Sequence, residues 1–197
     1  MTDLVFATNN KHKLFEAQTK IGDKFKIISL ADLNFNEEIE ETSDTIEGNA
    51  RIKAEIIYNR FGINSFADDT GLEVEALGNA PGVYTARYAG ENATFSDNCN
   101  KLLHEMQGKA NRNARFRTAI CLILNGQHYI FEGLVHGKIT ETAFGNGGFG
   151  YDPVFMPDGY DKTFAELPLE IKNTISHRGK ALDKLCDFLE SHTLLSV

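Results

Sequence analysis

The chain has 197 residues, of which 42% are hydrophobic and 24% charged, and its formal net charge at pH 7 is -8. This length and composition are those of a globular protein with one sizeable domain or two closely packed lobes. The acidic balance argues against nucleic acid or an anionic membrane as partner, because both attract an excess of Lys and Arg. A small anionic ligand stays possible if positive side chains gather at one place.

The three cysteines, Cys99, Cys121 and Cys186, are scattered along the chain without the spacing of a metal site or a CxxC pair. We therefore expect free thiols and a cytoplasmic location. We expect neither a signal peptide nor a membrane span, because the apolar run at residues 4–7 is short and no later run is long enough.

In chain order, the first predicted element is a buried strand over residues 4–7. The polar loop Thr8–Lys13 and a helix follow it. A strand, a polar loop and a helix N-terminus in this order favour anions, because free backbone N–H groups and the helix dipole face the loop. Asn10 offers amide donors, and Lys11 and Lys13 offer charge. The loop lacks the glycines of a Walker A motif, and a plain helix cap with two solvated lysines is the alternative interpretation.

A second strand over residues 25–30 and an acidic, solvated loop over residues 34–41 precede a predicted helix over residues 46–60. Asp44 is the predicted N-cap of this helix, with Glu47 three residues further on. Lys53 lies off the apolar stripe of the helix. Its side chain can reach a cleft or water, and water is the default expectation.

Two adjacent acids, Asp68 and Asp69, follow an apolar run in the first half of the chain. An apolar run over residues 63–67 predicts a short buried strand that stops at Asp68 and Asp69. Because side chains alternate along a strand, the two carboxylates are expected to point in different directions. Acids at the carboxyl end of a strand in an α/β sheet lie where ligands bind, and their oxygens suit Mg²⁺. The alternative interpretation is an ordinary Asp-Asp-Thr-Gly turn.

The middle of the chain predicts a strand, a loop, a helix and then a β-hairpin. Residues 72–76 alternate like a half-exposed strand, residues 77–90 predict an ordered loop and residues 95–106 a helix. The runs 115–124 and 128–136 flank Asn-Gly, which is typical of a hairpin with a type I′ turn.

The last quarter of the chain begins with a glycine-rich stretch over residues 145–155. Its glycines allow backbone to approach a ligand, and Phe149 or Tyr151 can stack on a flat ring. Ser176 is the predicted N-cap of the last helix, which places His177 and Arg178 in its first turn. Basic residues there oppose the helix dipole, which suggests a functional reason for them, and a solvated pair is the alternative interpretation.

Together, five blocks of sequence resemble the inosine triphosphate pyrophosphatase family, also called the Ham1 family. They are FATNNKHK at residues 6–13, EET at 40–42, ADDTGLEVEALGNAPGVYTARYAG at 67–90, GGFGYDPVF at 147–155 and ISHRGKAL at 175–182. The resemblance implies a single α/β domain over residues 1–197, with an elongated mixed β-sheet flanked by helices and two lobes around a central cleft. It also implies a homodimer, and Mg²⁺-dependent hydrolysis of ITP, dITP and XTP to the monophosphate and pyrophosphate.

The resemblance also assigns roles to residues. Asp69 resembles the catalytic acid and a metal contact, supported by Asp68, and either Glu40 or Glu41 resembles the second metal ligand. In the first loop, Asn9 stands where the family frequently has Gly. The residues that resemble contacts to the nucleotide are Thr8, Asn9, Asn10, Lys11, His12, Lys13, Lys53, Thr70, Phe149, Gly150, Tyr151, Asp152, Lys172, His177 and Arg178.

Two other functions compete with this one. A Maf-type pyrophosphatase has a similar shape but selects dTTP, UTP or modified nucleotides, and a substrate panel would separate the two. A nucleotide-binding regulator without catalysis is the other. The acids at residues 40, 41, 68 and 69 argue against such a regulator, because a protein that only binds phosphates gains little from carboxylates.

Overall fold

The structure is a computed structural model that describes residues 2–22 and 25–194, without the side chains of Thr2, His12, Thr193 and Leu194. The described residues form two compact units. The first unit draws on Met1–Asp69, Thr118–Gly133 and Arg178–Val197, and the second consists of Thr70–Arg117 and Leu134–His177. Each unit has a core of its own.

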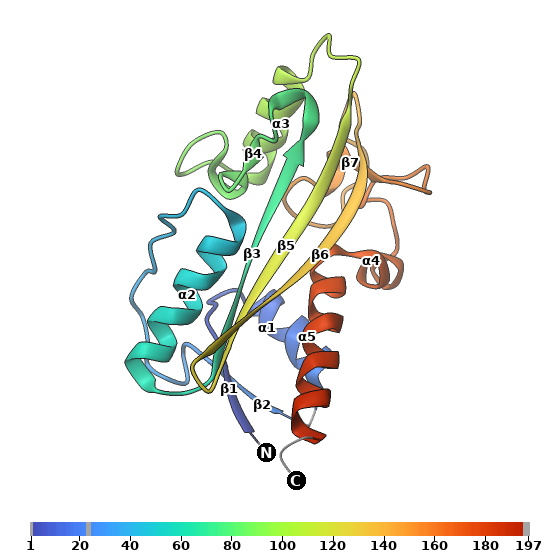
Figure 1. The fold of residues 1–197 in the computed structure, drawn as a ribbon. Helices are drawn as coiled ribbons and strands as arrows, with labels where there is room; N and C mark the ends of the chain where they lie inside the picture. The colour runs from blue at the N-terminus through green and yellow to red at the C-terminus, as the bar shows by residue number, and fades with distance from the viewer. Residues whose placement is uncertain (1, 23–24, 195–197) are drawn as a thin grey trace. The chain divides into compact units, whose positions relative to one another are not determined.

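Figure 1 shows the course of the chain through its helices and strands. The α-helices of the described residues are α1 (Lys11–Ile21), α2 (Ile46–Phe61), α3 (Phe95–Glu105), α4 (Leu169–Ile175) and α5 (His177–Leu194). The strands are β1 (Thr2–Phe6), β2 (Phe25–Ser29), β3 (Ser65–Val74), β4 (Pro81–Gly82), β5 (Asn113–Leu124), β6 (Gln127–Ile139) and β7 (Phe155–Pro157).

Hydrogen bonds join the strands in the order β2-β1-β3-β5-β6-β7, and β4 pairs with β3. Strand β1 runs parallel to both β2 and β3, whereas β4 pairs antiparallel with β3 and β7 pairs antiparallel with β6. The sheet is therefore mixed, and the predicted α/β class with helices around a mixed sheet is confirmed.

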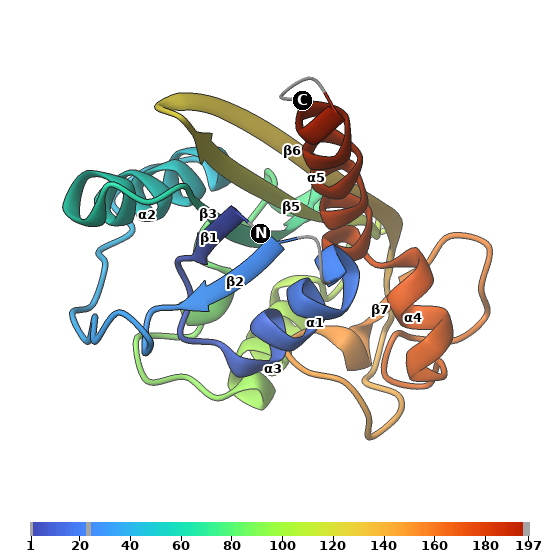
Figure 2. The same ribbon diagram turned by 90° about the horizontal axis from the view of Figure 1, so that it is seen from below.

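The first unit buries β1 on both faces. Leu4 and Phe6 pack with α1 and α5, whereas Val5 and Ala7 pack with α2. Figure 2 shows α2 on one side of β1 and α1 with α5 on the other. A strand covered by helices on both faces needs apolar side chains at every position, which explains the uninterrupted apolar run at residues 4–7.

In the second unit, β3 contributes apolar side chains to a core on one face and a buried ion pair on the other. Leu72 and Val74 of β3 share a core with Leu102 and Met106 of α3. Glu73, which lies between these two β3 residues in the sequence, instead accepts a hydrogen bond from Arg115 Nε at 2.5 Å. The half-exposed strand predicted over residues 72–76 is wrong: Glu73 is buried at 9% exposure, the strand ends at Val74 and Glu75–Leu77 form a 3-10 turn. The pairing of Glu73 with Arg115 and Arg117 compensates its charge, which makes the burial tolerable.

One prediction about β3 is wrong. The strand does not stop at Asp68 and Asp69 but continues through Asp-Asp-Thr-Gly to Val74. Pairing with β4 extends the backbone ladder to Leu72 and Glu73, and nearby cations compensate the two acids, so burial within a strand is tolerated. The turn interpretation is therefore excluded.

The N-cap of α2 is also one residue later than predicted. Thr45, not Asp44, caps the helix, because its side chain accepts from Gly48 N at 3.1 Å. The Ser43 and Thr45 hydroxyls lie so close to Gly48 that a Cβ there would be 1.9 Å from Ser43 Oγ. Only glycine fits against this cap.

Other local predictions are confirmed. Asn125 and Gly126 both have positive φ, 51° and 79°, as a type I′ turn requires. Helix α5 begins at His177, directly after Ser176. The cysteines are free, and burial raises the pKa of all three thiols to about 11. No helix in residues 2–22 and 25–194 has both the length and the apolar character needed to cross a bilayer.

Candidate functional site

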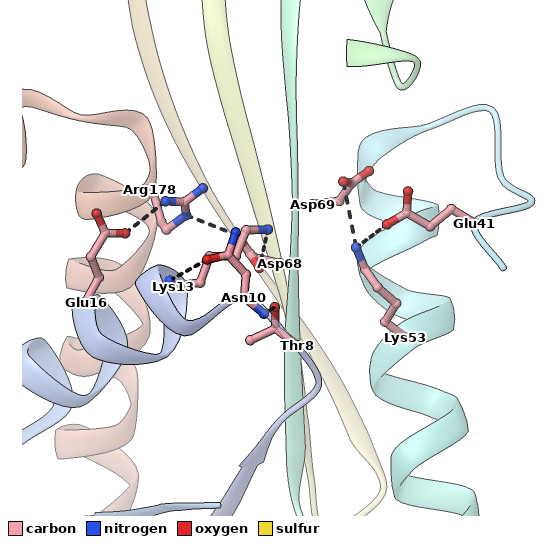
Figure 3. A network of polar contacts seen from close by, with 9 residues as sticks. All are labelled: Thr8, Asn10, Lys13, Glu16, Glu41, Lys53, Asp68, Asp69 and Arg178. Carbon is pink, nitrogen blue, oxygen red and sulfur yellow. Dashed lines mark hydrogen bonds and ion pairs between the residues drawn. The ribbon is translucent and has the colours of Figure 1, made fainter. Parts of the chain in front are cut away.

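The two adjacent aspartates of β3 point to opposite faces of the strand, as the alternation predicts. Figure 3 shows Asp68 directed toward α1 and α5, and Asp69 directed toward α2. Both carboxylates are buried: the Asp68 side chain is 1% exposed and the Asp69 side chain 13%. Burial of a charge is costly without partners, and each aspartate has a different set of them.

Asp68 is held by two cations. Lys13 Nζ of α1 donates to its carboxylate at 2.9 Å, and Arg178 Nε of α5 donates at 3.2 Å. Arg178 Nη1 also donates to Glu16 at 2.9 Å. Burial alone would raise the pKa of Asp68, but the charges of Lys13, Arg178 and Lys53 outweigh it and hold the pKa far below its usual range. Asp68 therefore stays ionised and takes no proton near neutral pH.

The loop before α1 is an ordered helix start. Thr8 Oγ1 accepts from Asn10 N at 3.2 Å, and Asn10 Oδ1 accepts from Lys13 N at 3.2 Å. Asn9, Asn10 and Lys11 are exposed, and the side chain of His12 lies outside the described residues. The interpretation of the loop as a helix cap is confirmed, but only one of its two lysines is solvated. Lys11 is solvated, and Lys13 is paired with Asp68.

Asp69 has looser contacts. Lys53 Nζ of α2 lies 3.7 Å from Asp69 Oδ1 and 2.5 Å from Glu41 Oε1. Asn49 Nδ2 donates to Asp69 Oδ2 at 3.4 Å. The prediction that Lys53 faces water is wrong: its side chain is 13% exposed. Burial would lower the pKa of Lys53, but the charges of Asp69, Asp68 and Glu41 raise it overall, so the ammonium keeps its charge.

The sequence left Glu40 and Glu41 open as the second acid. Glu40 is exposed, whereas Glu41 shares the Lys53 ammonium with Asp69. Sequence reasoning missed Asn49, which is 1% exposed and also accepts from Ser43 N at 2.9 Å. A polar residue next to Ala50, on the buried face of a helix, was the signal that could have found it.

Asp69 and Glu41 fit a hard divalent cation. Carboxylate oxygens are ligands that Mg²⁺ prefers, and a positive charge, the Lys53 ammonium, already lies against both. In the part of the chain that the structure describes, no three His, Cys, Asp or Glu side chains gather as a preformed metal site. The protein would thus supply two carboxylates, with water and ligand oxygens as the other ligands, which is a common arrangement for Mg²⁺.

In the second unit, the glycine-rich stretch is closed by Asp152. Its carboxylate accepts from Phe149 N at 2.7 Å and pairs with Lys172. The Lys172 ammonium lies 4.8 Å from the centre of the Phe149 ring, and that ring is 43% exposed. Gly148 has a φ of +76°, and a Cβ there would lie 2.2 Å from Asp152 Oδ2. Asp152 and Lys172 thus hold the loop from below, and the Phe149 ring stays exposed on it.

The other predicted residues of this unit are mostly buried. Tyr151 is 2% exposed, and its hydroxyl donates to Thr85 O at 2.9 Å, so of the two candidate stacking rings only Phe149 is accessible. The carbonyl of Gly150 accepts from Cys99 Sγ. His177 is buried with its ring stacked on Phe116 at 4.7 Å. Thr70 is half-buried on β3.

The structure is that of an α/β protein in which lysine, arginine and carboxylate side chains form buried ion pairs beside the parallel strands β1 and β3. The positive side chains of these pairs suit an anionic ligand. A model of the Ham1 family matches residues 4–188. The chain belongs to the Ham1 family, and the resemblance drawn from the five sequence blocks is confirmed.

Individual relatives match nearly the whole chain. A Flavobacterium johnsoniae protein named dITP/XTP pyrophosphatase is 56% identical over 186 residues, which are 94% of this chain and 97% of the relative. A Porphyromonas gingivalis protein of the same name is 50% identical over 190 residues, 96% and 98% of the two chains. The solved structure of the Staphylococcus aureus Ham1 protein has a TM-score of 0.93 at 38% identity, covering 97% of this chain and 100% of that one.

Proposed function

We propose that this protein hydrolyses the non-standard purine nucleoside triphosphates dITP, XTP and ITP to the monophosphate and pyrophosphate. The near full-length match to relatives named dITP/XTP pyrophosphatase carries the proposal. The buried lysines and carboxylates around Asp68 and Asp69 support it, because they suit a polyanionic substrate. We further propose that the chain acts as one domain, in the cytoplasm and as a homodimer. The family resemblance supports all three, and the free thiols support the location.

The triphosphate carries three to four negative charges, which repel an attacking water. We assign Lys13, Lys53 and the exposed start of α1 at Thr8–Lys11 to its phosphates, with His12 by resemblance. Mg²⁺, when bound by Asp69 and Glu41, would supply positive charge that stabilises the developing negative charge of the transition state.

Asp69 is the proposed catalytic residue, because it is the less tightly held of the two acids. With Asn49 on one oxygen at 3.4 Å and Lys53 near the other at 3.7 Å, it can position a water for attack on the α-phosphorus. Asp68 is the proposed positioning residue. Its carboxylate is engaged by Lys13 and Arg178, so it fixes those cations and takes no part in proton transfer.

For the second unit, we propose that the exposed Phe149 ring stacks on the purine and that Asp152 and Lys172 fix the loop that carries it. Tyr151 and Gly150 would support this loop from inside. Selection of a 6-oxo purine needs a hydrogen-bond donor, for which His177, Arg178, Thr70 and nearby backbone are candidates. Adenine would leave such a donor unpaired, which can reject it by about 10⁴-fold.

The test is a panel of nucleoside triphosphates incubated with Mg²⁺, with and without EDTA, in which the released phosphate species is identified. We expect the monophosphate and pyrophosphate from dITP, XTP and ITP, little turnover of ATP, and no turnover in EDTA. Release of orthophosphate, or a preference for dTTP or UTP, would contradict the proposal.

A further inference from the structure

Lys53 occupies an unusual place between two acids. Its ammonium lies 2.5 Å from Glu41 Oε1 and 3.7 Å from Asp69 Oδ1 (Figure 3). These are the same two carboxylates that fit a divalent cation. A lysine that only bound phosphate would have no need to touch both.

We propose that Lys53 is an internal counter-ion. In the nucleotide-free protein its ammonium holds Glu41 and Asp69 together and competes with a divalent cation for them, until a phosphate group draws the ammonium away. This inference rests on the proposed metal-dependent function and concerns the order in which metal and nucleotide bind.

Burial makes this counter-ion necessary. The side chains of Lys53 and Asp69 are each 13% exposed, and that of Glu41 is 27% exposed. In such surroundings charges are screened less than in water, so two carboxylates at one place repel each other strongly unless a cation lies between them. The Lys53 ammonium supplies that cation from within the chain.

The arrangement also lets the cation leave. Asp69 lies on β3 and is held by Asn49 on its second oxygen, whereas Lys53 carries its charge on a flexible four-carbon stem. The ammonium can therefore move while the carboxylates stay.

Competition has a thermodynamic consequence. If metal binding must displace Lys53, the metal affinity of the free protein is reduced by the fraction of molecules in which the bridge is formed. A phosphate that offers the ammonium another partner raises that affinity, and the metal in turn raises the affinity for the nucleotide. Metal and nucleotide are thereby made to bind as a pair.

The test measures metal binding without turnover. Mn²⁺ is titrated into the nucleotide-free full-length protein, and unbound Mn²⁺ is followed by electron paramagnetic resonance. We expect Lys53→Met to bind Mn²⁺ about tenfold more tightly than the wild type, within the usual range for coupled sites. Lys53→Gln is the second variant, in case Lys53→Met fails to fold.

Arg51→Met is the matched control. It removes one positive charge from the same helix, but Arg51 is exposed and pairs with Glu55. We expect its Mn²⁺ affinity to stay within about twofold of the wild type, since exposed charges are screened. Adding Glu41→Gln to Lys53→Met should abolish the gain.

Wild-type protein gives a test that needs no variant. Its Mn²⁺ affinity should rise when a hydrolysis-resistant dITP analogue is present, after subtraction of the Mn²⁺ that the analogue binds in a protein-free titration. Unchanged affinity there, or equal or weaker Mn²⁺ binding by the folded Lys53 variants, would overturn the inference. Hydrolysis of dITP is assayed on the same wild-type preparation, so failure of the proposed function would be recognised separately as a lack of pyrophosphate release.

Discussion

The two faces of β3 each carry a buried aspartate, but the two aspartates have different surroundings. Asp68 is 1% exposed and sits within 3.2 Å of two cations, whereas Asp69 is 13% exposed and its contacts to Asn49 and Lys53 lie at 3.4 and 3.7 Å. A carboxylate held closely on all sides is suited to fixing its neighbours. We propose from this comparison that Asp68 is the structural acid of the pair and Asp69 the reactive one, because their cationic partners lie at different distances.

The largest expected effect is on catalysis at Asp69. Asp69→Asn keeps the shape of the side chain but removes the charge that metal and water need, and we expect kcat for dITP to fall by about 10³-fold. Steady-state release of pyrophosphate measures it, and Asp161→Asn, at an exposed position, is the control. Turnover close to that of the control would remove Asp69 from its role.

The next effect is on stability at Asp68. Asp68→Asn leaves Lys13 and Arg178 buried with their charges uncompensated, so the free energy of unfolding should fall by about 3 kcal/mol. Urea unfolding measures the loss, with Asp69→Asn as the comparison. If the two variants lose equal stability, the distinction between the two faces is wrong.

A smaller effect is expected from the residue that orients Asp69. Asn49→Ala removes the amide that donates to Asp69 Oδ2, and we expect kcat for dITP to fall by about tenfold, as the loss of one positioning hydrogen bond predicts. Asn59→Ala, at an exposed position of the same helix, should leave kcat unchanged. An Asn49 variant as active as Asn59→Ala would show that Asp69 needs no orienting partner.

The smallest effect is expected at the edge of the Asp68 cluster. Glu16→Gln removes one of the partners of Arg178, but its side chain is 27% exposed. We expect a loss of at most about 1 kcal/mol in the free energy of unfolding, since partly solvated ion pairs contribute little. A loss as large as that of Asp68→Asn would mean that Glu16 and not Asp68 organises this face.

Local pattern was enough to predict much of this arrangement. The apolar run of β1, the amphipathic α2 and the Asn-Gly hairpin follow from periodicity and turn chemistry, and alternation along β3 placed Asp68 and Asp69 on opposite faces. These features depend on residues close together in the sequence. The family resemblance supplied the roles that local pattern left open.

Local sequence pattern does not predict ion pairs between residues that lie far apart in the chain. Lys53 was expected in water because its partners, Glu41 and Asp69, are 12 and 16 residues away in the sequence. Sequence pattern makes no prediction about Glu16, whose partner Arg178 is 162 residues away. Local pattern predicts a strand end at Asp68 and Asp69, because sequence alone does not show the cations that make their burial tolerable.

Gly48 lies in the cap of α2, just before two side chains of the candidate site. Asn49 and Lys53 project from the first two turns of α2, directly after the cap in which a single added methyl group would collide with Ser43. Even the mildest replacement at Gly48 would therefore shift the helix start and misalign both side chains with Asp69. We therefore expect the placement of Asn49 and Lys53 beside Asp69 to depend on a residue that has no functional group.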